Sequence, residues 1–227
     1  MESWSDPPPR LEVARWAEER TEAVLQPAGR DKPRVRRLRS SGGQRAVLKD
    51  YWECPWWLRH TVGRWVVSIE RRAYQKLEGC RGIPAFWGCP DVFSMLVQYV
   101  DGRPVHRMQR GELPWVGVLQ ARQLIVDLER CGVSHGDIGH DSNGDFGRDA
   151  NLIWGKDEQL YLFDFAGASF AQDVTLGFYG VGREHDRLLV TKLLQRFFPE
   201  RTQEPEYLGL QQLSPWSRRW LRWFKKL

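Results

Sequence analysis

Apolar residues alternate with polar ones early in the chain, which is the pattern of strands in an antiparallel sheet. The stretches TEAVLQ (21–26), VRRLR (35–39) and RAVLKDY (45–51) have this pattern, and the turn SSGG (40–43) joins the last two. A short helix over residues 11–20 precedes the first stretch. We therefore expect a small antiparallel sheet in the first part of the chain.

A helical repeat follows between residues 65 and 77. Ala73 and Leu77 lie on one stripe of this predicted helix, and Glu70 lies on the same stripe. Burying a carboxylate is unfavourable unless a cation pairs with it. Lys49, on the third predicted strand, is the cation that we expect beside Glu70.

The rest of the chain is mainly helical in pattern. It predicts a strand (93–102), a helix (114–132), a hairpin of two strands (151–154 and 159–165) and a helix (184–198). A sheet followed mostly by helices indicates an α+β fold with two unequal lobes. The expected parts are an N-terminal extension with a short helix (1–20), a small antiparallel-sheet lobe (21–100) and a shortened, mostly helical lobe (101–227).

Composition narrows the class of partner and the compartment. Lys and Arg total 34 against 29 Asp and Glu, so the surplus of five positive charges suits anionic partners without singling out nucleic acid, nucleotide or lipid. The four cysteines form no C-x-x-C pair, which is typical of reduced thiols. We see no secretory leader and no apolar stretch long enough to span a bilayer, so we expect a cytoplasmic protein.

Candidate chemistry lies in the stretch SHGDIGHDSNGDFGRDAN (134–151) and the hairpin after it. Asn151 opens the first strand of that hairpin and Asp164 closes the second, so both lie at one end of the ribbon. Asp137, in the preceding His-Gly-Asp turn, can reach the same end. Carboxylate and amide oxygens suit Mg²⁺, which also takes phosphate oxygens from a nucleotide.

At these positions the sequence resembles the protein-kinase-like superfamily. AVLK matches the strand lysine, HGD the catalytic turn and DFA the DFG motif. The resemblance covers roughly residues 21–198 and implies a bilobal fold that uses ATP and Mg²⁺ for phosphoryl transfer. HGD without arginine and the short segment after DFA are most similar to bacterial lipopolysaccharide-core sugar kinases and RIO-like kinases.

The resemblance implies a role for each residue of the reaction centre. Asp137 would accept or orient the proton of the acceptor hydroxyl. Asn151 and Asp164 would bind Mg²⁺. Lys49, held by Glu70, would bind the α- and β-phosphates of ATP.

Four further positions match the family's nucleotide pocket and its framework. Val47 lies on the same strand face as Lys49 and would cover the adenine. Gln98 and Val100 would offer the adenine backbone hydrogen bonds. Asp186 would be the structural acid that braces the catalytic turn.

Two departures from the family pattern concern the metal site and the phosphate loop. The asparagine follows the aspartate by 151 − 137 = 14 positions where kinases have about five. Asn143 is the rival asparagine, but Asn151 directly precedes the strand, as the hairpin requires. The loop PAGRDKP (27–33) has one glycine, so other groups, such as Arg30 and Lys32, must contact the phosphates.

The sequence allows three interpretations of the function, two of which differ in the acceptor. About twenty residues separate Asp164 from Asp186 and no APE motif occurs, which leaves little room for a peptide-docking platform. We therefore favour a hydroxyl on a sugar or lipid-linked sugar, of the lipopolysaccharide type, over a protein, and expect no nucleic acid partner. A RIO-like serine/threonine protein kinase is the alternative, and the poor glycine loop also allows a catalytically inactive scaffold.

The tail SPWSRRWLRWFKKL (214–227) has tryptophans at helical spacing among Arg and Lys residues. One interpretation is a final helix that closes the second lobe. The other is a basic amphipathic helix on an anionic membrane, which would make the protein peripheral at the inner membrane.

Overall fold

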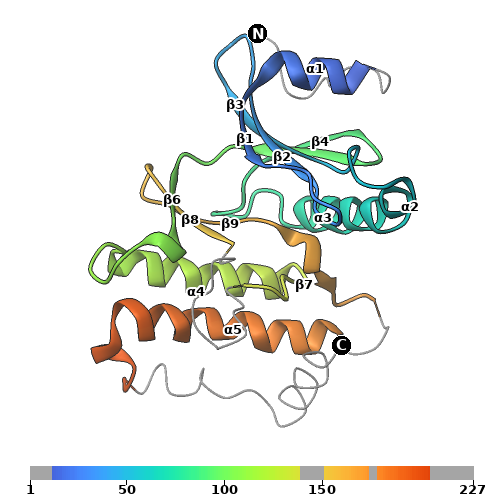
Figure 1. The fold of residues 1–227 in the computed structure, drawn as a ribbon. Coiled ribbons are helices and arrows are strands. Elements are labelled where there is room, and N and C mark those ends of the chain that lie inside the picture. The colour runs from blue at the N-terminus through green and yellow to red at the C-terminus, as the bar shows by residue number, and fades with distance from the viewer. Residues whose placement is uncertain (1–11, 139–150, 174–177, 205–227) are drawn as a thin grey trace. The chain divides into compact units, whose positions relative to one another are not determined.

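The computed structural model describes residues 12–138, 151–173 and 178–204 (Figure 1). The predictions for Asn143 and the tail 214–227 concern residues outside this set. The chain divides into two compact units. The first comprises Met1–Gly79 and Pro84–Val100, and the second comprises Cys80–Ile83 and Asp101–Leu227.

The first unit contains a five-stranded antiparallel sheet in the order β1-β2-β3-β5-β4, which confirms the expected sheet. Its turn between β2 and β3 closes where Ser40 N–H donates to the Gln44 carbonyl at 2.8 Å. Strand β4 was not predicted. The strands are β1 (Thr21–Gln26), β2 (Arg34–Arg39), β3 (Arg45–Asp50), β4 (Phe86–Asp91) and β5 (Ser94–Gln98).

Strand β3 has two faces of different character. Ala46 and Leu48 are fully buried and pack with Ala17 of helix α1 (Val13–Arg20), which lies against the sheet. Val47 and Lys49 point to the opposite face and are half-buried. Because strand side chains alternate between faces, the core packing of β3 fixes the face on which Lys49 lies.

The helix of the first unit begins earlier than predicted. Helix α2 (Trp56–Leu58) passes into a π-helical turn, η2 (Arg59–Gly63), and then into α3 (Arg64–Lys76). Gly63 is inside this run because a Cβ there would lie 3.0 Å from the Tyr51 ring. The predicted helix at residues 65–77 corresponds to α3, and the helical residues 56–63 before it were not predicted.

The second unit is mostly helical. Its two long helices, α4 (Trp115–Arg130) and α5 (Phe178–Phe197), pack side by side (Figure 1). A three-stranded antiparallel sheet has the order β6-β8-β9, and β10 pairs with β7. The strands are β6 (Gly102–Pro104), β7 (Val133–Ser134), β8 (Leu152–Gly155), β9 (Leu160–Leu162) and β10 (Ser169–Phe170), and the 3₁₀ turns are η3 (Val105–Arg107), η4 (Phe165–Gly167) and η5 (Pro199–Arg201).

Helix α5 also begins earlier than the predicted 184–198. A Cβ at Gly182 would lie 2.3 Å from the Ser134 hydroxyl oxygen, so a glycine is needed where α5 crosses β7. The predicted bounds had placed Asp186 at the start of the helix, but Asp186 lies inside it. Within the described residues, no helix is both long and apolar enough to cross a membrane.

Candidate functional site

In the first unit, Lys49 and Glu70 form an ion pair. The Lys49 Nζ atom lies 2.5 Å from Glu70 Oε1, and Glu70 is only 1% exposed. Glu70 lies on the buried stripe of α3 together with Val66 and Ala73. The contact expected from the sequence is present, and it provides the buried carboxylate with its cation.

The three residues predicted to contact adenine lie on β3 and at the end of β5. Val47 shares the half-buried face of Lys49. The N–H of Gln98 donates to the Ala85 carbonyl at 2.8 Å, so that N–H is already engaged. No hydrogen bond between described residues engages the backbone of Val100. Of the two residues, Val100 therefore has the backbone N–H that could bind a ligand.

The loop between β1 and β2 carries Arg30 and Lys32, and both side chains are exposed. The loop is closed by Gly29, whose N–H donates to the Lys32 carbonyl at 3.0 Å. Two cations on one short loop can contact an anion, but each would have to lose side-chain freedom on binding. Their role in phosphate binding stays a prediction.

In the second unit, Asp186 organises the His-Gly-Asp turn. Its carboxylate accepts hydrogen bonds from the Ser134 hydroxyl at 2.8 Å and from the N–H groups of His135 and Gly136 at 2.8 and 2.9 Å. Burial raises the pKa of Asp186 to about 7, and the three donors oppose that rise. The carboxylate fixes the backbone that leads into Asp137, whose side chain is exposed.

His135 orients the same turn from within the core. One ring nitrogen, Nε2, lies 3.0 Å from the Phe163 carbonyl, and the other, Nδ1, lies 3.3 Å from the N–H of Asp137. A carbonyl can only accept and an N–H can only donate, so these contacts require the neutral ring with its proton on Nε2. The buried histidine thus links the backbone of Asp137 to the strand that ends before Asp164.

Asn151 is buried and contacts the same turn. Its Nδ2 donates to the carbonyl oxygen of Asp137 at 3.1 Å, which leaves the amide oxygen available as an acceptor. The backbone carbonyl of Asn151 also accepts from Phe163 N–H at 3.1 Å. Asn151 and Asp164 therefore lie at the same end of the β8–β9 hairpin.

Asp164 has a strained backbone. Its φ of 63° is in the left-handed region, which a residue with a side chain adopts at a cost of about 1–3 kcal/mol. The turn that it starts packs on the His-Gly-Asp turn, because a Cβ on Gly136 would lie 3.0 Å from the Gly167 carbonyl oxygen. A Cβ on Gly167 would lie 3.7 Å from Asp137 Cβ. Gly136, which also has a positive φ of 76°, thus lets the turns of Asp137 and Asp164 approach closely.

Lys192 is a residue of this region that we did not predict. It lies on α5, burial lowers its pKa, and the nearby negative charge of Asp137 partly opposes that change. A single lysine in a helix gives no sequence signal of its own. Its spacing from His185 and Leu189, which are buried on the same stripe of α5, is the one pattern that could have indicated it.

The donor set fits a hard divalent cation. The two oxygen-bearing side chains are the Asn151 amide and the Asp164 carboxylate, and Mg²⁺ is commonly bound through one or two carboxylates together with phosphates and water. The described residues contain no group of three or more His, Cys, Asp or Glu side chains that could hold a metal alone. These two residues would therefore hold the ion jointly with a phosphate ligand.

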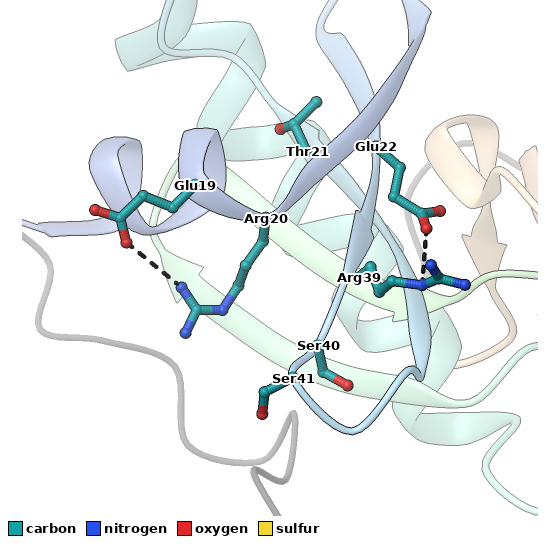
Figure 2. Close-up of a pocket in the computed structure, with 7 residues that line it drawn as sticks. All are labelled: Glu19, Arg20, Thr21, Glu22, Arg39, Ser40 and Ser41. Atoms are coloured by element: carbon teal, nitrogen blue, oxygen red, sulfur yellow. Dashed lines mark ion pairs between the residues drawn. The ribbon is translucent and has the colours of Figure 1, made fainter.

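A polar pocket lies elsewhere in the first unit, between α1, β1 and the β2–β3 turn (Figure 2). Its charges neutralise one another, because Arg39 pairs with Glu22 at 2.8 Å and Arg20 with Glu19 at 3.8 Å. It contains none of the predicted site residues. The lining residues are Glu19, Arg20, Thr21, Glu22, Arg39, Ser40 and Ser41.

The chain matches no protein-family model and no curated protein. Many solved structures resemble it, among them two of a Rio2 kinase. The Rio2 kinase from Chaetomium thermophilum aligns with a TM-score of 0.56 at 15% identity, over 82% of this chain and 60% of the other. The chain has a protein-kinase-like fold.

Comparison with the second structure supports the same kinase-like fold. It is the Rio2 kinase-ADP/Mg²⁺-phosphoaspartate complex from the same organism, with a TM-score of 0.57 at 13% identity. It aligns over 92% of this chain and 62% of the other. The chain spans about 60% of the length of either neighbour, and at this low identity the likeness shows the fold alone.

Proposed function

We propose that this protein is an ATP- and Mg²⁺-dependent kinase that transfers the γ-phosphate to a hydroxyl group. One observation carries the proposal. Asp137 is held in a turn whose backbone is fixed by Asp186, by His135 and by the amide of Asn151. A general base that is already positioned loses little freedom in the reaction, which is how kinases gain most of their rate.

Each residue has one task in this proposal. Asp137 orients the acceptor hydroxyl and takes up its proton. Lys49 binds the α- and β-phosphates, while Glu70 keeps its ammonium in place. Asn151 and Asp164 would hold Mg²⁺, which would supply positive charge to neutralise the transferring phosphoryl group. The ADP/Mg²⁺ complex of the Rio2 neighbour supports this ligand pair.

The acceptor is proposed to be a sugar or a lipid-linked sugar. Helix α5 already begins at Phe178, which leaves only a short segment after Asp164 for binding a peptide. A small platform suits a compact acceptor better than a protein chain. A RIO-like kinase acting on protein remains the second candidate, because both neighbours are Rio2 kinases.

Acceptor chemistry can be tested directly. Purified protein is mixed with labelled ATP, Mg²⁺ and either sugar or protein acceptors, and the product is treated with hydroxylamine. A phosphate ester survives that treatment, whereas a phosphoaspartate such as that in the second neighbour is cleaved. Label that is stable on sugar supports the proposal, and stable label on a protein acceptor supports the alternative. Hydroxylamine-labile label on the protein itself would instead indicate a phosphoaspartate and contradict transfer to a hydroxyl.

Asp137→Asn should reduce transfer by about 10²–10⁴-fold, the usual contribution of a general base. The matched control is Asp157→Asn, because Asp157 lies in the β8–β9 turn of the same unit and hydrogen-bonds Tyr161. Equal transfer by the wild type and Asp137→Asn would exclude the proposed reaction. If Mg²⁺ and ATP do not raise the melting temperature of the wild type, the scaffold interpretation gains support.

The tail 214–227 is proposed to contact an anionic membrane, where a lipid-linked acceptor would be found. The basis is its sequence alone, with tryptophan and basic residues at helical spacing. Sedimentation with anionic vesicles should recover less protein when residues 214–227 are deleted. Equal recovery of both proteins would exclude a membrane role for the tail.

A further inference from the structure

The start of the long helix in the first unit exposes large aromatic side chains. Trp56, Trp57 and Trp65 are 68%, 56% and 63% exposed, and Val62 beside them is 45% exposed. A folded protein normally hides tryptophan, because each ring buries a large apolar area. Three strongly exposed tryptophans within ten positions therefore indicate a surface that binds something.

The π-helical turn explains how these residues share one side. Trp57 lies in α2 and Trp65 near the start of α3, with η2 between them. In an ordinary α-helix, residues eight positions apart drift away from one another, but a π turn takes up one extra residue. By this spacing, Trp65 falls on the side of Trp57, and the exposed Val62 belongs to the π turn that joins them.

The surrounding charge is positive. Arg64 is exposed, and no ion pair engages it within the part of the chain that the structure describes. No Asp or Glu occurs between Glu53 and Glu70. Glu53 is paired with Arg34 at 2.7 Å, and Glu70 is buried against Lys49. The segment that carries the exposed aromatic side chains therefore has an exposed cation and no acidic residue of its own.

We propose that Trp56, Trp57, Val62, Arg64 and Trp65 form a membrane-docking surface, the tryptophan face, that binds the headgroup region of an anionic bilayer. Tryptophan favours this region because its ring is apolar and its N–H is polar. Arginine adds attraction to anionic lipid and can extend its charge toward the headgroups. The face lies on one side of a helix, so it can lie flat in the interface without spanning the membrane.

Charge complementarity is the reason to favour lipid over a second copy of this chain. The whole chain carries a net charge of +5, so two copies repel one another, whereas an anionic bilayer attracts each of them. The inference does not depend on the proposed kinase reaction. A protein that lacks all transferase activity would still bind vesicles through this face.

The test uses the full chain and sucrose-loaded vesicles made of phosphatidylcholine with or without phosphatidylglycerol. The wild type should bind the anionic vesicles, and added salt should weaken binding. The triple variant Trp56→Ser, Trp57→Ser, Trp65→Ser should lower the partition coefficient by at least about tenfold. Arg64→Glu, which leaves the aromatic rings in place, should lower it about fivefold or more.

Matched controls separate this face from general hydrophobicity and charge. Val24→Ser with Leu25→Ser removes two side chains of β1 that are 48% and 49% exposed. Arg15→Glu reverses a charge on α1 whose side chain is 87% exposed. Both controls should bind like the wild type. Thermal unfolding of each variant identifies any loss of folding, in which case Arg64→Glu alone decides the outcome.

Several results would overturn the inference. The first is a wild type that binds neither kind of vesicle, or binds both equally. The second is a triple variant and an Arg64→Glu variant that bind as the wild type does, since the tail or another surface then accounts for binding. The third is a wild type that dimerises in solution through these tryptophans without binding vesicles, which would assign the face to a second copy of the chain.

Discussion

Each unit of the protein has a buried carboxylate among its own candidate residues, and the two carboxylates are compensated differently. Glu70 in the first unit is paired with a side chain, the Lys49 ammonium. Asp186 in the second unit accepts from two backbone N–H groups and the Ser134 hydroxyl. A side-chain pair positions one functional group, whereas a carboxylate bound to backbone determines the shape of a whole turn.

The difference predicts different consequences of mutation. Removing one partner of the Lys49–Glu70 pair leaves the strand and the helix intact, because neither backbone depends on the pair. Removing Asp186 leaves backbone donors of the His-Gly-Asp turn without an acceptor inside the core. Loss of Asp186 should therefore reduce both stability and activity. Loss of Lys49 or Glu70 should reduce mainly activity.

The largest effect is expected for Asp186→Ala. It leaves two buried donors, the Ser134 hydroxyl and the His135 N–H, without an acceptor. Each such group costs about 1–3 kcal/mol, so the free energy of unfolding should fall by about 2–6 kcal/mol. Urea unfolding followed by circular dichroism measures this loss. Asp157→Asn should stay within about 0.5 kcal/mol of the wild type. A loss below about 1 kcal/mol in Asp186→Ala would mean that the turn holds its shape without this carboxylate.

The next largest effect is expected in the pH dependence of the free energy of unfolding, which also originates from Asp186. The pKa of Asp186 is about 7 in the folded protein, above its ordinary value of 3.8, so the folded state binds more protons than the unfolded chain between these values. The stability that Asp186 contributes is complete below pH 3.8 and is lost as pH rises to about 7. Its slope is at most about 1.4 kcal/mol per pH unit.

The measurement is the difference between the unfolding free energies of the wild type and Asp186→Asn at several pH values. Asparagine has no proton to lose, so the difference isolates the titration of position 186. The wild type should lose stability relative to the variant as pH rises from 4 to 7. A difference that is constant over this range would show that the carboxyl group does not titrate there.

A smaller loss of stability is expected for Lys49→Met. The buried Glu70 can take up a proton once its cation is gone, so the cost should be about 1–3 kcal/mol. The double variant Lys49→Met, Glu70→Leu should recover most of that loss, because the buried polar group is also removed. Phosphoryl transfer should be lost in both variants. Recovery of transfer together with stability would contradict the role proposed for Lys49.

The smallest effect on stability is expected for Lys192→Met. Burial disfavours the charge of Lys192, as its lowered pKa indicates, so an apolar side chain of similar length should leave stability unchanged within about 1 kcal/mol. Transfer should fall about tenfold because the positive charge near Asp137 is lost. Lys156→Met is the control, since Lys156 pairs with Asp101 elsewhere in the unit. Equal activity of the two variants would remove Lys192 from the site.

Local pattern predicted much of this molecule. The alternation in 21–51 led to the antiparallel sheet, and the helical stripe around Glu70 led to its pairing with Lys49. The hairpin argument also placed Asn151 and Asp164 at one end of a ribbon, as the structure has them. These features depend on neighbours along one element, which periodicity encodes well.

The features that escaped prediction depend on distant contacts. Gly63 and Gly182 lie inside helices because Tyr51 and Ser134 approach them, and no local pattern reports such an approach. The position of Lys192 near Asp137 has the same character, since α5 and the His-Gly-Asp turn are far apart in the sequence. Sequence alone therefore located most of the elements and the Lys49–Glu70 contact, but it missed β4 and the close approaches at Gly63 and Gly182.

Gly182 has a consequence for how this protein tolerates change. It has no side chain and no chemistry, yet a single added methyl group would have to displace the Ser134 hydroxyl that Asp186 binds. In a survey of all single substitutions, we expect alanine at this position to be as damaging as the loss of an active-site carboxylate. Intolerance of substitution at position 182 would thus result from the close spacing of a helix and a strand, and not from a role in a reaction.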